Sequence, residues 1–331
     1  MLDRFAAFLD SHAKILLTTH ENPDGDGVGA AVALAAYLKE QGTEVRIVVT
    51  PSLPENLRFL DPQSWVEAFE PAGRHADLAQ WPEAWLLVDA SEPQRMGPLT
   101  PAFLATKAVR ACLDHHLKDA PDGFHAEFTD STASASAELV YDLVRPRVGG
   151  ELPPVMVQAL YAGLVSDTGN FRHSNSTPKV HHAAADLIAQ GAHPARTFNA
   201  LYQTATPAKL KLFGRAMGGL QLRGEGQFAY VAVTQEDLAA CGATSEDMDD
   251  LVEEPRKLKG VEVAALFSET ADGRAKVSLR SRERVDVNAV CRQFGGGGHR
   301  LASGAKAAQS LSAFIAQVEA AVLAQLGRDI V

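Results

Sequence analysis

The chain has 331 residues, of which 46% are hydrophobic and 22% charged, and its formal net charge is −10. This length exceeds that of a usual single domain, so we expect two domains, each with its own core. The net negative charge argues against long nonspecific contact with nucleic acid, because such binding needs a broad basic face. A short anionic substrate stays compatible with it, since bound cations reverse the local charge.

The sequence also indicates the cellular compartment of the protein. It contains no apolar run of about 18 residues, the length of a membrane span, and its N-terminus lacks the features of a secretory signal. The three cysteines, Cys112, Cys241 and Cys291, stand at spacings that fit neither a disulfide framework nor a Cys-x-x-Cys zinc site. These features predict a cytoplasmic protein without a membrane segment.

Residues 1 to about 190 alternate between strand-like and helix-like stretches. Short apolar runs suited to buried parallel strands cover 15–19, 45–49, 85–88 and 109–113. We expect a helix over 28–41 that ends at Gly42, and further helices following Asp130-Ser131-Thr132 up to Leu143, over 154–165 and over 178–190. This alternation predicts an α/β domain with a doubly wound, mostly parallel sheet.

The remainder of the chain has a different pattern of expected strands and helices. We expect the first domain to cover 1–190, a helical linker punctuated by prolines to cover 191–210, and a smaller mixed-sheet α/β domain to cover 211–331. Strands of the second domain are expected over 228–234, 261–268 and 275–281. Its helices are expected over 245–251, 287–294 and 310–326.

Acidic and histidine residues follow the first and third expected strands. After 15–19 comes His20-x-x-x-Asp24-x-Asp26, where proline and glycine force a turn that lets the three side chains converge. A helix-capping Asp in a polar loop is the alternative. Asp89 ends the strand at 85–88, and it is the candidate for a carboxylate shared by two cations, although a turn or cap role stays open.

Two further clusters complete the set. Asp114-His115-His116 follows the strand at 109–113, and adjacent histidines on an extended chain point to opposite sides. One is therefore expected to bind metal and the other to face substrate, with Asp114 accepting a ring N–H. Asp167 ends an apolar helix, where a carboxylate is disfavoured unless a cation compensates.

Together these clusters offer two imidazoles and four carboxylates as ligands. Ligands delivered to the carboxyl ends of parallel strands share one edge of the sheet, so we expect a pair of divalent cations there. Mixed nitrogen and oxygen ligands suit Mn²⁺ better than Mg²⁺. Mg²⁺, Co²⁺ and Zn²⁺ stay open as alternatives.

In the tail we expect a glycine-rich loop that forms an anion site. Gly296, Gly297 and Gly298 precede His299, and amide groups free of side chains form a concave site for anions. Arg280 and Arg282 are two apart on an expected strand, so both are expected to reach phosphate oxygens. The alternative is a flexible loop beside a solvated arginine strand.

The motifs HENPDGD, LLVDA, LDHH and GLVSDTGNF resemble, in order and spacing, the four motifs of the DHH phosphoesterase family, over residues 15 to about 180. The segments SLRSR and FGGGGHRLASGA resemble the DHH-associated C-terminal domain. With this tail and length, the chain is most similar to the bacterial oligoribonucleases of the family that also act on adenosine 3′,5′-bisphosphate. The resemblance implies hydrolysis of short RNA or nucleotides.

The resemblance also implies roles for the residues. His20 and Asp24 would bind one cation, Asp26, His115 and Asp167 the other, and Asp89 both. His116, with Asp114, would act on the phosphoryl group, while the tail residues hold the substrate.

Two other functions stay open: hydrolysis of cyclic or linear adenine dinucleotides (c-di-AMP or pApA), and a non-catalytic nucleotide-binding regulator. The presence of every matched ligand argues against the second. A homodimer also stays open.

Overall fold

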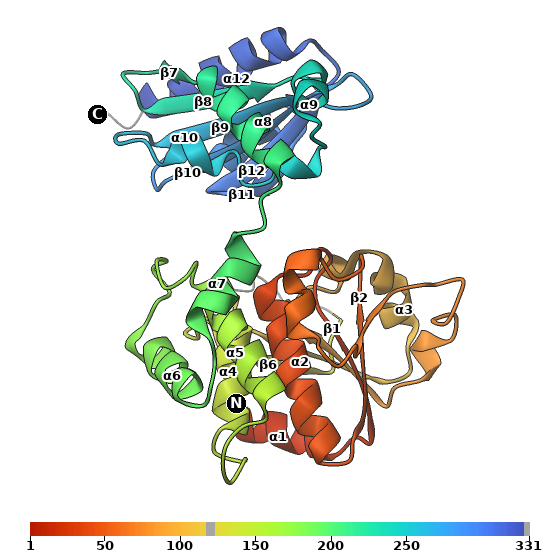
Figure 1. Ribbon diagram of the computed structural model, residues 1–331. Helices are drawn as coiled ribbons and strands as arrows, with labels where there is room; N and C mark the ends of the chain where they lie inside the picture. Colours follow the sequence, from red (N-terminus) through yellow and green to blue (C-terminus); the bar gives the residue numbers. More distant parts are fainter. Residues whose placement is uncertain (117–122, 328–331) are drawn as a thin grey trace. The chain divides into compact units, whose positions relative to one another are not determined.

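The computed structural model describes residues 1–116 and 123–327, which fall into two compact units, Met1–Thr204 and Ala205–Val331 (Figure 1). The linker expected over 191–210 spans this division. Helix α7 (Pro194–Tyr202) packs on the first unit, where Leu201 joins the core. Helix α8 (Pro207–Gly218) belongs to the second unit.

The first unit contains a six-stranded sheet in the order β3-β2-β1-β4-β5-β6, and every neighbouring pair is parallel. The strands are β1 (Lys14–Thr18), β2 (Glu44–Val49), β3 (Val66–Ala68), β4 (Ala84–Val88), β5 (Val109–Asp114) and β6 (Ala126–Thr129). The four strands expected from apolar runs are confirmed to within a residue or so. The two edge strands, β3 and β6, were missed because they are short and half-exposed, without an apolar run.

Helices cover both faces of this sheet, which confirms the doubly wound α/β fold. Ile15 and Leu17 pack in a large core with α1, α2, α4 and α5, whereas Leu16 and Trp85 pack on the opposite face with α3. The helices of the first unit, besides α7, are α1 (Leu2–Asp10), α2 (Gly25–Glu40), α3 (Thr100–Ala105), α4 (Ser136–Val144), α5 (Pro154–Asp167) and α6 (Pro178–Ala189), with 3₁₀ turns η1 (Glu55–Leu60), η2 (Leu78–Gln80) and η3 (Pro93–Leu99).

Close packing of α2 against α5 positions two of the expected ligands. A Cβ at Gly29 would overlap the carbonyl oxygen of Ala159, so only glycine lets the two backbones approach this closely. Figure 1 shows α2, α4 and α5 side by side. Asp26 in the first turn of α2 and Asp167 in the last turn of α5 therefore reach the same place.

The second unit has a mixed six-stranded sheet in the order β11-β12-β10-β9-β8-β7, in which only β8 and β9 pair in parallel. The strands are β7 (Gln221–Arg223), β8 (Phe228–Val233), β9 (Val263–Glu269), β10 (Ala275–Ser281), β11 (Gly297–His299) and β12 (Ala302–Ala307). Its helices, besides α8, are α9 (Gln235–Cys241), the 3₁₀ turn η4 (Glu246–Met248), α10 (Glu253–Arg256), α11 (Val287–Arg292) and α12 (Leu311–Leu326).

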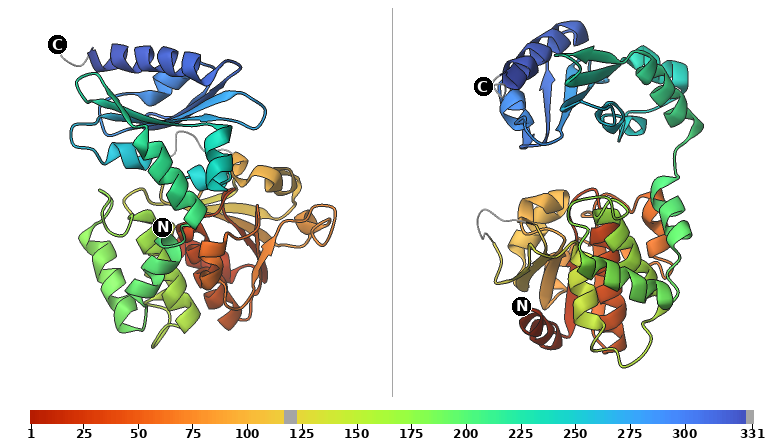
Figure 2. Two further views of the ribbon diagram at one scale, coloured as in Figure 1. Left: turned by 45° about the horizontal axis from the view of Figure 1, so that its top comes forward. Right: turned by 90° about the vertical axis from the view of Figure 1, so that its left-hand side faces the viewer.

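This sheet also has a core on each face. Phe267 and Phe314 pack on the face covered by α11 and α12, and Leu212 and Leu266 pack on the face covered by α8 and α9. In the right-hand view of Figure 2 the dark-blue helix α12 and the green helix α8 lie on opposite sides of the sheet. Among the described residues, no helix combines the length and apolarity that crossing a bilayer requires.

Two expectations for the second unit were wrong. The helix expected over 245–251 is only the short turn η4, because the backbone becomes extended at Asp249 with ψ of 140° and Asp250 then adopts a positive φ of 67°. The glycine run is not wholly a loop, since Gly297–His299 form the edge strand β11 paired with β12. A Cβ at Gly296 would overlap the carbonyl oxygen of Gly304, so glycine lets the chain enter this strand.

Candidate metal centre

The strand order reverses at β1, which pairs with β2 on one side and β4 on the other. In open α/β sheets such a switch point leaves a crevice at the carboxyl ends of the strands, where ligands bind. His20 lies two residues beyond the end of β1, Asp89 directly follows β4, and His115 directly follows β5. The sheet thus delivers these side chains to one edge.

His20 faces two carboxylates. Its Nδ1 donates to the carbonyl oxygen of Glu21 at 2.9 Å, which leaves Nε2 pointing toward Asp24 and Asp89. Nε2 lies 3.6 Å from Asp24 Oδ2 and 3.6 Å from Asp89 Oδ2. Asp24 caps α2, because its Oδ1 accepts from the backbone N–H groups of Asp26 and Gly27. Asp24 therefore caps the helix with Oδ1, while its Oδ2 faces His20 and can bind a cation.

Asp26 and Asp89 are buried, and their oxygens face donors at the start of α4. Asp26 accepts from the backbone N–H of Ser136 at 2.6 Å and of Ala137 at 2.8 Å. Asp89 Oδ1 accepts from the Ser136 hydroxyl at 3.0 Å. Asp89 also adopts a left-handed backbone with φ of 64°, a conformation that concentrates at functional sites.

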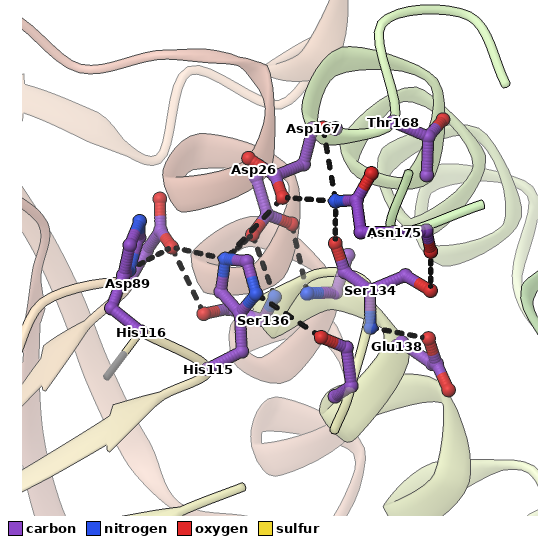
Figure 3. Close-up of polar contacts among 12 residues, drawn as sticks. Asp26, Asp89, His115, His116, Ser134, Ser136, Glu138, Asp167, Thr168 and Asn175 are labelled. Carbon is purple, nitrogen blue, oxygen red and sulfur yellow. Dashed lines mark hydrogen bonds and ion pairs between the residues drawn. The ribbon is translucent and has the colours of Figure 1, made fainter. Parts of the chain in front are cut away.

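His115 completes a second group of ligands (Figure 3). Its Nε2 lies 3.4 Å from Asp167 Oδ2, 3.6 Å from Asp89 Oδ1 and 3.9 Å from Asp26 Oδ2. This Nε2 is buried and makes no hydrogen bond among the described residues. A buried polar atom without a partner is costly, and a cation among these oxygens would satisfy it.

The ligand atoms form three overlapping groups, within each of which all atoms lie within 4.8 Å of one another. The groups are His20 with Asp24 and Asp89, Asp26 with His115 and Asp167, and Asp89 with His115 and His116. Separations of 3.4–3.9 Å are too long for good hydrogen bonds but leave room for a cation between the atoms. The donor set of imidazoles and carboxylates fits divalent metal ions, and Asp89 belongs to two of the groups.

His116 and Asp114 lie beside these groups. Asp114 Oδ1 accepts from His116 Nδ1 at 2.8 Å and from the backbone N–H groups of both histidines. The expectation that the two histidines point to opposite sides was wrong, since their ring centroids are 4.4 Å apart. The strand ends at Asp114, so the alternation of an extended chain no longer applies. His116 Nε2 is left without an intramolecular partner among the described residues.

A short segment, Ala133–Ala137, contacts three of the six expected metal ligands, Asp26, Asp89 and His115, and no pattern in its residue types predicted this. The carbonyl oxygen of Ala133 lies 3.3 Å from His115 Nδ1. Asn175 Nδ2 bridges the carbonyl oxygen of Ser134 at 2.9 Å and Asp167 Oδ2 at 3.2 Å (Figure 3). These contacts orient the ligands through backbone groups, which sequence patterns do not reveal.

Crowded carboxylates shift the pKa values of the centre. Burial raises the pKa of Asp26 well above its ordinary value, and Asp89 and Asp167 raise it further. Burial likewise raises the pKa of Asp167 to about 6, with Asp89 among the contributors. For His20, burial lowers the pKa, but Asp24 and Asp89 outweigh this and raise it to about 10. Protons thus partly neutralise the centre when no cation does so.

The expected substrate-binding residues of the tail lie together on one side of the second sheet. Arg280 is opposite Ala302 on β12, which is opposite His299 on β11, so the three side chains share a face. Arg280 Nε lies 3.4 Å from Glu253. Arg282, just beyond β10, donates to the carbonyl oxygen of Arg256. The glycines Gly297 and Gly298 form the edge beside His299, and Gly296 precedes them.

Comparison with known proteins gives concordant matches. Residues 14–164 match the DHH family, N-terminal domain, and residues 226–324 match the DHHA1 domain. The chain is 32% identical to the bifunctional oligoribonuclease and PAP phosphatase NrnA of Thermus thermophilus, over 88% of this chain and 83% of that protein. It is 29% identical to the protein of the same name from Bacillus subtilis, over 88% of each.

Solved structures share the fold. An exopolyphosphatase-related protein from Bacteroides fragilis superposes with a TM-score of 0.89 at 23% identity, over 97% of this chain and 95% of that one. RecJ from Thermus thermophilus in complex with Mn²⁺ superposes with a TM-score of 0.58 at 14% identity, over 99% of this chain and 55% of that one.

Loss of the Asn175 amide is expected to weaken metal binding. The Asn175→Ala variant removes the group that fixes Asp167, and such supporting contacts are worth roughly 10–100-fold in metal affinity. Calorimetric titration of the metal-free protein with Mn²⁺ measures the change in metal affinity. Asn199→Ala is the matched control, because the side chain of this residue of α7 is exposed and makes no hydrogen bond to an expected ligand among the described residues. Equal affinities for the two variants would contradict the role given to Asn175.

Stabilisation by metal is expected to grow with pH. Because the folded pKa of Asp167 is raised to about 6, its protonation stabilises the metal-free protein at low pH, and this contribution is lost as pH rises through that value. Protons also compete with metal for Asp167 and His20. Saturating Mn²⁺ should therefore raise Tm more near about pH 7.5 than near about pH 5.5. Scanning calorimetry with and without metal tests this, and a pH-independent gain would contradict it.

Proposed function

The chain belongs to the DHH family of phosphoester hydrolases, and on that premise we propose that it cleaves short oligoribonucleotides to mononucleotides and removes the 3′-phosphate of adenosine 3′,5′-bisphosphate. The observation that carries the proposal is the pair of ligand groups that meet at Asp89, one through His20 and the other through His115. Relatives that align over most of the chain are named for both activities.

We further propose Mn²⁺ as the metal, held by His20, Asp24 and Asp89 on one side and by Asp26, His115, Asp167 and Asp89 on the other. The mixed imidazole and carboxylate set favours a borderline ion over Mg²⁺. A structure of the fold-related RecJ contains Mn²⁺. Ions bound there would supply charge that lowers the pKa of a bound water toward neutrality and neutralises phosphate charge.

The protein groups then orient and stabilise the reacting phosphate. His116 donates through Nδ1 to Asp114, which leaves Nε2 for the substrate, and in the protonated ring Nε2 can donate to a phosphoryl oxygen or to the leaving oxygen. The hydrogen bond with Asp114 raises the pKa of His116, with burial opposing, which favours the protonated ring. Asp114 thereby acts on the substrate through His116.

The second unit supplies phosphate contacts in this proposal. Arg280 and His299 share a face beside the glycine edge Gly297–Gly298, and Arg282 lies near the same strand end. Arginine forms paired hydrogen bonds to phosphate oxygens, and glycine amides approach them without steric hindrance. These groups would bind the part of the substrate that is not cleaved.

A substrate comparison tests the activity. With Mn²⁺, the purified protein should hydrolyse di- to pentanucleotide RNA and adenosine 3′,5′-bisphosphate with higher kcat/KM than a cyclic dinucleotide. Asp89→Asn should lower kcat by roughly 10³-fold or more, because several kcal/mol of charge stabilisation depend on the metal pair. Asparagine tolerates the positive φ of this position, so the fold should persist. A preference for the cyclic dinucleotide, or an active Asp89→Asn variant, would overturn the proposal.

Removing the Arg280 side chain should weaken substrate binding without impairing the chemical step. Arg280→Ala is expected to raise KM by roughly tenfold, the scale of one charge-assisted hydrogen bond, with kcat nearly unchanged. Steady-state kinetics on a trinucleotide measures both constants. Arg274→Ala is the matched control, since Arg274 lies at the far end of β10 in a turn and pairs with Asp272. The assignment of Arg280 is wrong if the two variants have the same KM.

A further inference from the structure

The second unit contains a cavity of about 580 Å³ at the opposite end of β10 from Arg280. Its floor is the sheet, where Ser268, Lys276 and Lys306 lie side by side on β9, β10 and β12. Its wall is α9 and the segment that follows, including Leu238, Ala243 and Met248. The volume lies within the range of small-molecule sites, roughly 300–1,000 Å³.

The two lysines of the cavity are directly opposed across β10 and β12. Like charges in this position destabilise a sheet. Within the described part of the second unit, neither ammonium forms a close ion pair with a carboxylate, in contrast to Arg274 and Arg280 nearby, although Asp249 is near enough to Lys276 to attract it. Glu269, at the rim, accepts from the backbone N–H of Gln235 at 3.0 Å instead. An anion between the lysines would relieve their repulsion.

The wall of the cavity restricts the kind of anion. Leu238, Ala239, Ala243 and Met248 offer an apolar surface a short way from the lysines. A ligand with an apolar ring and a phosphate would match the apolar wall and the two lysines, since lysine is a common phosphate ligand. A methionine beside a flat ring makes a favourable sulfur contact.

We propose that this cavity is a second nucleotide site, which binds a base against α9 and Met248 and its phosphate between Lys276 and Lys306. The choice of a nucleotide rests on the proposed function, because a nucleoside monophosphate is its product. The bound nucleotide is either the free monophosphate or a nucleotide of an oligonucleotide strand. Both share the chemistry of the site.

Methyl NMR on the full chain tests the proposal without relying on catalysis. The chain has 5 methionines, so ¹³C-methyl-methionine labelling gives few signals, and Met248→Leu identifies the one in the cavity. With excess EDTA to prevent hydrolysis, AMP or a pentanucleotide should shift the Met248 signal saturably. Adenosine, which lacks the phosphate, should bind at least roughly tenfold more weakly.

Two variants distinguish ligand binding in this cavity from ligand binding at Arg280. The double variant Lys276→Ala/Lys306→Ala should weaken the effect on Met248 by roughly tenfold or more, with the signals of Met96 and Met156 in the first unit unchanged. Arg280→Ala should leave the Met248 titration as in the parent protein. A shift with AMP identifies the free monophosphate as a ligand, and a shift with the pentanucleotide alone identifies a strand nucleotide.

The outcomes also distinguish this inference from the proposed function. A Met248 signal that neither ligand moves, or that moves equally in the double variant, overturns the second site even if the enzyme cleaves RNA with Mn²⁺. Conversely, a Met248 shift that the double variant loses supports the site even if no substrate is hydrolysed.

Discussion

The first unit is organised around the electrostatic cost of gathering four carboxylates, Asp24, Asp26, Asp89 and Asp167, at one edge of a sheet. Unpaired buried charge is expensive, and mutual repulsion adds to the cost. The fold offsets part of it with backbone N–H groups at the starts of α2 and α4. The imidazoles of the site face the remaining oxygens at distances that leave space between the atoms. The arrangement is suited to divalent cations, whose charge completes the compensation.

Support for the ligands comes from parts of the chain far apart in sequence. The segment Ala133–Ala137 provides a carbonyl oxygen near His115, two N–H groups for Asp26 and a hydroxyl for Asp89. A displacement of this one segment would therefore disturb several ligands together. Rigid support of this kind determines how well a metal site holds its geometry.

The two units use sheets in different ways. The parallel sheet of the first unit is buried on both faces and presents its ligands only at the strand ends, where the chain leaves the sheet. The mixed sheet of the second unit carries polar side chains on part of one face itself, with Arg280 and His299 toward one end and Lys276 and Lys306 toward the other. A site at strand ends gives convergent ligands in a small volume. A site on a sheet face spreads its contacts, which suits an extended or modular ligand.

The sequence by itself determined the central strands, the α/β class and the residues His20, Asp24, Asp26, Asp89, His115 and Asp167 as candidate ligands. Buried strands carry apolar runs, and acids after such runs stand out by residue type. Only the tertiary structure decided the edge strands β3 and β6, the pairing of β11, the approach of both His115 and His116 to Asp89, and the contacts of Ser136 and Asn175. Edge strands are half-exposed and lack an apolar run, while backbone N–H donors are the same in every residue except proline. Their partners are set by packing between segments over a hundred residues apart, as between Asp26 and Ser136.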